Sequence, residues 1–239
     1  MIHPKLTAQQ AFCNSCNCSH SLPRTPAMEA ARDLMARMDQ EVSTDYLYGE
    51  ARGKMFGVLV CRTPEGNQKT LKAFSGQYNG QWQLQGWVPP LFDVPDFNNL
   101  NDPMEKQIKA LGKEAAKATG DKSHRTTILQ QRKQLSRQLM LDIHALYRLH
   151  NFKGEQRSLV DLFPNGRGIP TGTGDCCAPK LLNFAAIHHL QPLGLLEFYW
   201  GKTNRSTSRH EGQFYLACED KCGPILGFLL CGIQDRSTP

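Results

Sequence analysis

A long helical segment with a basic surface divides this 239-residue sequence into two parts that both contain strands. In residues 126–149 the apolar positions recur at intervals of three, four and seven, so they form one stripe along a helix. Those positions are Ile128, Leu135, Leu139, Ile143 and Leu146. A second helical stretch precedes Gly120 and begins near Asp102 and Pro103. We therefore predict a helical hairpin arm, inserted at residues 102–152. Ordinary packing of these helices against the core is the alternative.

The formal charge of the chain is concentrated in the same segment. Residues 104–150 contain ten Lys and Arg against four Asp and Glu, an excess of six that equals the net charge of +6 of the whole chain. A basic stripe of this kind suits a phosphate backbone. We expect RNA to contact Lys122, Arg125, Arg132, Lys133 and Arg137. A solvated helix face without a partner is the alternative.

Strand patterns lie on both sides of the predicted arm. Residues 27–101 contain an amphipathic helix at residues 28–38 and two strands, KMFGVLVCR and KTLKAFSGQY, which the turn TPEGNQ connects. Residues 153–239 contain a helix at residues 175–189, a buried strand PLGLLEFYWG, and a short strand that leads into a last helix. The expected fold class is α/β of the α+β kind, a small sheet layered with helices.

Composition and termini narrow the protein class. Residues 1–26 lack apolar periodicity and predict a loose or disordered, Cys-rich lead-in that a metal could order. No apolar run approaches the ~20 residues of a membrane span, and the start MIHPKLTAQQAF lacks the apolar core of a secretory signal. A cytoplasmic protein is therefore expected. Nine cysteines, with one adjacent pair, then predict metal ligands or buried thiols and not disulfides.

Four cysteines fall at the starts of two predicted helices. Cys176 and Cys177 open one helix, and Cys218 and Cys222 lie four residues apart, on one face of the next. Helix dipoles favour thiolates at these positions, so three of them could hold zinc with a fourth position open to water. Buried thiols that pack as small hydrophobes are the alternative. A second candidate zinc cluster consists of Cys13, Cys16, Cys18 and His20.

Eight blocks of the sequence together resemble one known region. They are GKMFGVLVC, LKAFSGQYNG, WVPPLFD, the basic arm, LHNFKGEQRSLVDLF, PTGTGDCCAPKLLNFA, LGLLEFYWG and CEDKCGPILGFLLCG. These blocks are similar to the region that precedes the catalytic domain in long RluA-type pseudouridine synthases, and the similarity covers residues 54–232. The resemblance implies a role in RNA modification, with rRNA or tRNA and a pseudouridine synthase as partners.

The resemblance does not extend to the chemistry of the synthase. RluA-type catalytic domains carry an H-R-L-D-type motif with a catalytic Asp, and this chain contains no such motif. We therefore expect the appended region without its synthase, which does not isomerise uridine by itself. The leading hypothesis is an accessory domain whose basic arm binds RNA and whose cysteine site stabilises the core. A module that docks the arm onto the partner synthase is an alternative.

The expected order of elements also resembles the fold of zinc-dependent deaminases, in which Cys- or His-bearing motifs open two helices. The segment GDCCAPK at residues 174–180 is similar to the Cys-Ala-Glu-Pro-Lys helix start of some bacterial toxin deaminases. Ala178 stands where the proton-shuttling Glu would be, and Asp175 and Glu197 are the carboxylates that could replace it. A divergent zinc-dependent nucleobase deaminase is the enzymatic alternative.

Overall fold

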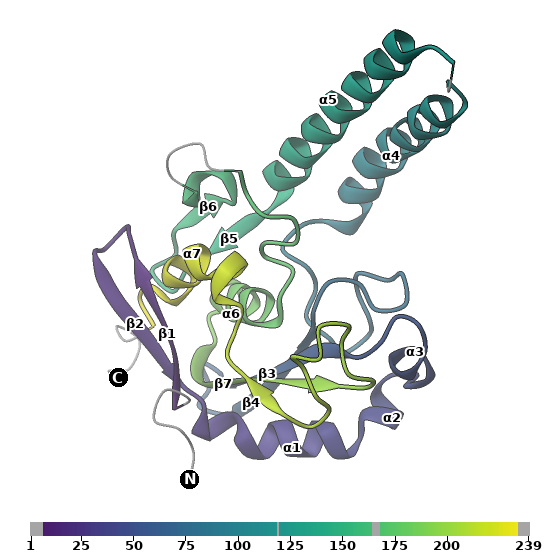
Figure 1. Cartoon of the computed structure of the whole chain (residues 1–239). Helices are drawn as coiled ribbons and strands as arrows, with labels where there is room; N and C mark the ends of the chain where they lie inside the picture. The colour runs from purple at the N-terminus through teal and green to yellow at the C-terminus, as the bar shows by residue number, and fades with distance from the viewer. Residues whose placement is uncertain (1–6, 119, 164–167, 234–239) are drawn as a thin grey trace.

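The computed structural model describes residues 7–118, 120–163 and 168–233 and shows a mixed α+β fold (Figure 1). The predicted fold class is therefore confirmed. A small antiparallel sheet lies in the body of the molecule, and a helical hairpin extends from one side of that body.

The central sheet has four antiparallel strands in the order β4-β3-β7-β8. The inner strands are β3 (Lys54–Arg62) and β7 (Gln191–Trp200), and the edge strands are β4 (Gln68–Phe74) and β8 (Phe214–Tyr215). The inner strands are nearly continuous apolar runs, as expected of strands that are covered on both faces. The strands predicted before and after the arm in the sequence are thus present, and β3 from before the arm pairs with β7 from after it.

The sheet has a separate core on each face, because successive side chains of a strand point to opposite sides. On one face α1 (Met28–Ala36) packs against a core that includes Phe56 and Phe198. On the other face α6 (Cys177–Ile187) and α7 (Glu219–Leu230) pack against a core that includes Leu59. Helices α6 and α7 therefore contact each other on the second face of the sheet.

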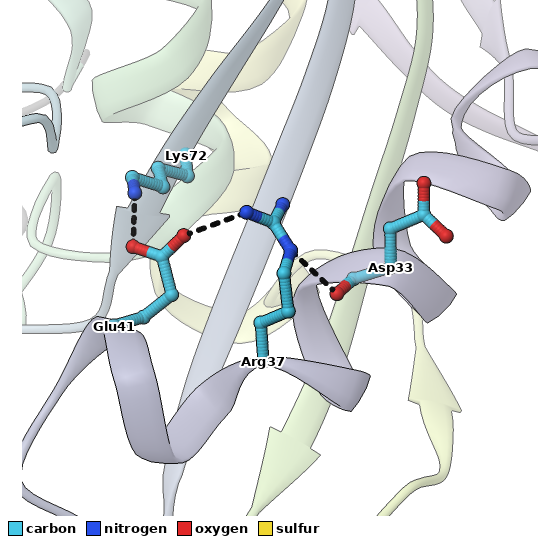
Figure 2. A network of polar contacts seen from close by, with 4 residues as sticks. All are labelled: Asp33, Arg37, Glu41 and Lys72. Carbon is cyan, nitrogen blue, oxygen red and sulfur yellow. Dashed lines mark hydrogen bonds and ion pairs between the residues drawn. The ribbon is translucent and has the colours of Figure 1, made fainter.

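Three short helices and a polar network complete the α1 side. The short helices are η2 (Thr25–Ala27), α2 (Met38–Glu41) and α3 (Asp45–Tyr48). Figure 2 shows the Glu41 carboxylate between two cations: Arg37 Nη1 lies 3.5 Å from Oε1, and Lys72 of β4 pairs with Oε2. Arg37 Nε also donates a hydrogen bond to the Asp33 carbonyl oxygen over 3.2 Å. The network links the end of the α1 layer to an edge of the sheet.

The arm consists of two antiparallel helices, α4 (Val94–Lys117) and α5 (Lys122–Leu146), which lie side by side (Figure 1). The hairpin was predicted, but α4 begins before the predicted start at Asp102. The side chain of Asp93 caps the helix by accepting a hydrogen bond from the Asp96 backbone N–H over 3.0 Å. Phe97 packs into the core near this start, so tertiary contacts extend the helix through a sequence rich in proline.

At the base of the arm a small sheet joins the hairpin to the body. It consists of β5 (Arg148–His150) and β6 (Gln156–Ser158), followed by the 3-10 helix η3 (Val160–Leu162). None of the helices in the described part of the chain has both the length and the apolar composition that crossing a membrane requires.

The N-terminal segment differs from the predicted loose lead-in. Within the described part of residues 1–26, β1 (Ala8–Cys13) and β2 (Cys18–Pro23) form an antiparallel hairpin, while residues 1–6 lie outside the described residues. The hairpin packs directly on α7. A Cβ placed on Gly227 of α7 would lie 1.9 Å from the Phe12 carbonyl oxygen, so only glycine permits this approach. The contact places α7, which precedes the last described residues, beside the N-terminal hairpin.

Candidate metal centre and basic groove

Four side chains from the two ends of the chain meet between the N-terminal hairpin and α7. The thiols of Cys13, Cys16 and Cys231 and the imidazole of His20 place one ligand atom each within 4.8 Å of one another. Three sulfurs and one nitrogen in this spacing could hold a metal ion. We call this group the hairpin centre. Among the described residues, no other group of three or more His, Cys, Asp or Glu side chains comes this close together.

Local structure explains why the hairpin supplies three of the four ligands. Cys13 ends β1, Cys16 lies in the turn, and His20 lies on β2. The turn closes through Asn17, whose φ of 55° is a left-handed conformation that Asn tolerates. Cys16 Sγ lies 3.1 Å from His20 Nε2. Cys231 is the C-terminal cap of α7, so the fourth ligand comes from the helix on which the hairpin packs.

The electrostatics of the hairpin centre favour a bound cation. Burial raises the pKa of the Cys16 thiol, but hydrogen bonds from His20, Cys231 and Cys13 outweigh it and lower the pKa to about 6. Burial and the neighbouring thiols raise the pKa of Cys231 to about 12. The Cys16 thiolate is therefore available near neutral pH, whereas the raised pKa of Cys231 means that this thiol needs a positive charge nearby to ionise. A metal ion supplies that charge, because thiolates are its ligands.

The structure groups Cys231, and not Cys18, with the other members of the N-terminal cluster. Cys18 is exposed, and its thiol donates a hydrogen bond to the Cys16 carbonyl oxygen over 3.2 Å. Cys231 was not predicted as a ligand, because more than 200 residues separate it from Cys13, Cys16 and His20 in the sequence. The signal that could have found it is the CGPILGFLLCG helix, which has a cysteine at its far end.

The cysteines predicted at helix starts lie in two different environments. Cys176 is the N-terminal cap of α6, Cys218 is that of α7, and Cys222 follows within the first turns of α7. Hydrogen bonding with Cys218 and Cys222, together with burial, raises the pKa of the Cys176 thiol far above its usual range. Cys177 points elsewhere: its thiol donates to the Met55 carbonyl oxygen over 3.4 Å. The structure thus brings three of the four thiols near one another, and zinc at this place stays a prediction.

The two carboxylates predicted as catalytic candidates are both held by neighbours. Glu197 of β7 is 4% exposed, and its Oε1 accepts a hydrogen bond from the Ala178 backbone N–H over 2.7 Å. Burial raises the pKa of Glu197 to about 7. Asp175 accepts a hydrogen bond from the Tyr147 hydroxyl over 2.7 Å, and burial raises the pKa of Asp175. Glu197 thus places a carboxylate at the first turn of α6, against the backbone of Ala178.

The predicted RNA-contacting residues lie in two separate places on α5. Arg132, Lys133 and Arg137 line a groove of about 620 Å³, whereas Lys122 and Arg125 are exposed nearer the tip of the arm. The remaining lining is largely apolar and includes Leu129, Met140, Leu141 and Ile169. Leu129 and Leu141 are 39% and 57% exposed, respectively. We call this feature the basic groove.

One arginine of the basic groove lies across both helices of the arm. A Cβ added to Gly112 of α4 would lie 3.4 Å from Arg132 Nε, so the Arg132 side chain rests on α4. The ion pairs of the arm's described residues are Lys109 with Glu105 and His124 with Glu114. None of the three groove cations takes part in an ion pair with the described residues, which leaves their charge available to a ligand.

Comparison of the chain with protein-family models, with curated proteins and with solved structures gives no match.

Proposed function

We propose that the chain is an RNA-binding accessory domain for RNA modification, and that it acts beside a pseudouridine synthase. The observation that carries this proposal is the basic groove, where Arg132, Lys133 and Arg137 share one face of α5. The excess charge of the chain lies in the arm, so the arm is the part that an RNA phosphate backbone attracts most strongly. The similarity of residues 54–232 to the region ahead of RluA-type catalytic domains supports the link to pseudouridine synthesis.

The composition of the groove suits RNA better than a simple polyanion. Arginine guanidinium planes can stack on bases while they contact phosphates. The apolar floor offers a surface for the faces of unstacked bases, which a phosphate alone would not need. Structured rRNA or tRNA with an unpaired segment is therefore the expected ligand.

We further propose that zinc occupies the hairpin centre and that its role is structural. Three Cys and one His fill a tetrahedral set, which leaves no ligand position for a substrate. Sulfur and imidazole ligands favour zinc over magnesium or calcium, which prefer oxygen. When bound, the ion would join the N-terminal hairpin to the end of α7.

The test of RNA binding compares two charge reversals of equal size. In the first, Arg132, Lys133 and Arg137 are changed to Glu. In the control, three exposed lysines of α4 are changed to Glu, namely Lys106, Lys113 and Lys117. Fluorescence anisotropy of labelled tRNA and of an rRNA fragment is measured at several salt concentrations. If the groove holds about three phosphates, reversing its charges should make the plot of log affinity against log salt less steep. The magnitude of the slope should decrease by about two to three.

Each outcome of this comparison decides the RNA proposal. A large loss in the groove variant with a smaller loss in the α4 variant supports it. Equal losses in the two variants would show that only net charge matters, and no binding by the wild-type protein would refute RNA binding altogether. Circular dichroism of both variants verifies that the arm remains helical.

A divergent zinc-dependent nucleobase deaminase is the second candidate, and the position of Glu197 favours it. The Glu197 carboxylate accepts a hydrogen bond from the backbone N–H of Ala178, the residue that stands at the position of the deaminase glutamate. Zinc held by Cys176, Cys218 and Cys222 would supply an activated water there. Elemental analysis of wild-type protein and a Cys218→Ser variant tests this candidate. Two zinc ions per chain, one of which is lost in the variant, are required, together with ammonia release from a cytosine- or adenine-containing RNA.

A further inference from the structure

A second cavity lies at the base of the arm, between the start of α4, the end of α5, β5 and α6. Its volume is about 480 Å³, which is within the range of small-molecule sites. Its walls combine apolar groups with a few polar ones. The lining includes Phe92, Asp93, Asp96, Arg148, His150 and Asn183.

Asn183 of α6 is the most informative residue of this cavity. The residue is 6% exposed, yet it lines the cavity wall. The His150 backbone N–H donates a hydrogen bond to Asn183 Oδ1 over 2.7 Å. This bond identifies the amide atom that faces the His150 N–H as the oxygen, so the Nδ2 group points away from that N–H.

The structure shows no hydrogen bond from Asn183 Nδ2 to another described residue, and this atom is not one of the described buried side-chain atoms left without a partner, which are Thr63 Oγ1 and Trp82 Nε1. The amide NH₂ group therefore reaches the surface of the cavity, where a ligand can contact it. This donor belongs to a side chain that lines a cavity large enough for a ligand. A polar donor held in a fixed orientation on the wall of such a cavity is the kind of group that orients a bound ligand.

The other polar groups define what kind of ligand fits. Asp93 and Asp96 offer carboxylate acceptors at the start of α4, while Arg148 already donates to the carbonyl oxygens of Ala145 and Tyr147. Two carboxylates disfavour a phosphate in the cavity itself. Phe92 and Pro90 provide flat apolar surface. The complementary ligand is uncharged and planar, and it carries both a hydrogen-bond acceptor and a donor.

We propose that this cavity binds a single unpaired nucleobase of the RNA, with Asn183 Nδ2 donating to a carbonyl oxygen or ring nitrogen of the base. The proposal rests on the proposed RNA-binding function and adds a base-recognition site at the root of the arm. An aspartate carboxylate accepts from the amino or imino group of the same base. Such a pocket takes a base that has left its stack, as RNA-binding proteins require for sequence recognition.

The test uses uncharged nucleosides, which separates base recognition from phosphate binding. Cytidine, adenosine and uridine are titrated into ¹⁵N-labelled protein, and the side-chain NH₂ signals of Asn183 are followed by NMR. We expect a saturable shift of these signals in the millimolar range with at least one nucleoside. Inorganic phosphate at the same concentrations should leave the signals in place.

Two variants and one control complete the experiment. Asn183→Asp retains the acceptor for the His150 N–H but removes the NH₂ donor. Ile187→Trp fills the mouth of the cavity from a position that is 45% exposed, so it leaves the core intact. Asn99→Asp on the exposed surface of α4 is the charge-matched control. Nucleoside affinity, followed by backbone amide shifts of the cavity residues, should fall at least tenfold in both cavity variants and remain unchanged in the control.

The outcomes distinguish this proposal from the proposal of RNA binding by the groove. Absence of any nucleoside shift in wild-type protein at 10 mM, about the weakest affinity of interest here, would overturn the cavity proposal. Shifts that persist in Asn183→Asp and Ile187→Trp would do the same. The charge reversal of the basic groove should abolish RNA binding without changing nucleoside affinity, so each proposal can fail alone.

Discussion

Replacement of Cys231 by Ser should remove most of the stability that we propose zinc to confer through the hairpin centre. Cys13, Cys16 and His20 are close in sequence, so they can bind zinc in the unfolded chain as well as in the folded one. Cys231 is different, because the unfolded chain must close a loop of about 210 residues to bring this thiol to the metal. The chain-entropy relation gives a cost of about 5 kcal/mol for that closure. The folded protein already holds Cys231 in place, so zinc should stabilise it by about that amount.

The measurement is urea unfolding of wild-type protein and of Cys231→Ser, each with zinc in excess and with zinc removed by a chelator. For a chain of this size the urea m-value is about 3 kcal/mol/M, so zinc should raise the wild-type midpoint by about 1.5–2 M. In Cys231→Ser the same comparison should give a shift close to zero. The loss of a buried thiol affects both zinc conditions equally, so it cancels from the comparison.

Cys18→Ser is the matched control, since Cys18 is an exposed cysteine of the same hairpin that lies outside the hairpin centre. It should keep the wild-type response to zinc. If Cys18→Ser loses the response while Cys231→Ser retains it, the assignment of the fourth ligand is wrong. A full zinc response in both variants would refute the cross-link argument itself.

Further predictions concern the packing of α7 and the behaviour of α5 in acid. Gly227→Ala should destabilise the protein by about 2 kcal/mol or more, since the added Cβ meets the Phe12 carbonyl oxygen. Gly223→Ala, with no atom within 4 Å of its added Cβ, should stay within about 1 kcal/mol of wild type in the same urea assay. Burial lowers the pKa of His144 below 6.5, so the unfolded chain takes up this proton first and stability should fall as the pH drops below about 6.5. Urea midpoints at pH 7.5 and 5.5 should differ less in His144→Gln than in wild type, and an unchanged difference would contradict this explanation.

Several features of the fold were accessible from local sequence patterns. The strand KMFGVLVCR became β3 with the predicted bounds, and the apolar stripe of residues 126–149 largely became α5. Both patterns repeat over distances of two to four residues, which is the range over which strand and helix geometry acts. The early start of α4 was not accessible in this way. Its first turn depends on the cap at Asp93 and on the packing of Phe97 against residues distant in sequence.

The amino-acid sequence by itself determined the types of the central strands and helices, the basic arm and the presence of cysteines suited to a metal, but not the N-terminal hairpin. Only the tertiary structure decided which of these side chains meet. Cys231 joins Cys13, Cys16 and His20 because the hairpin packs on α7 through Gly227. Asn183 faces a cavity because α6, β5 and the root of the arm converge there. Contacts of this kind join residues about 30 to more than 200 positions apart, and no local periodicity encodes them. The packing of complete elements against one another is what selects them.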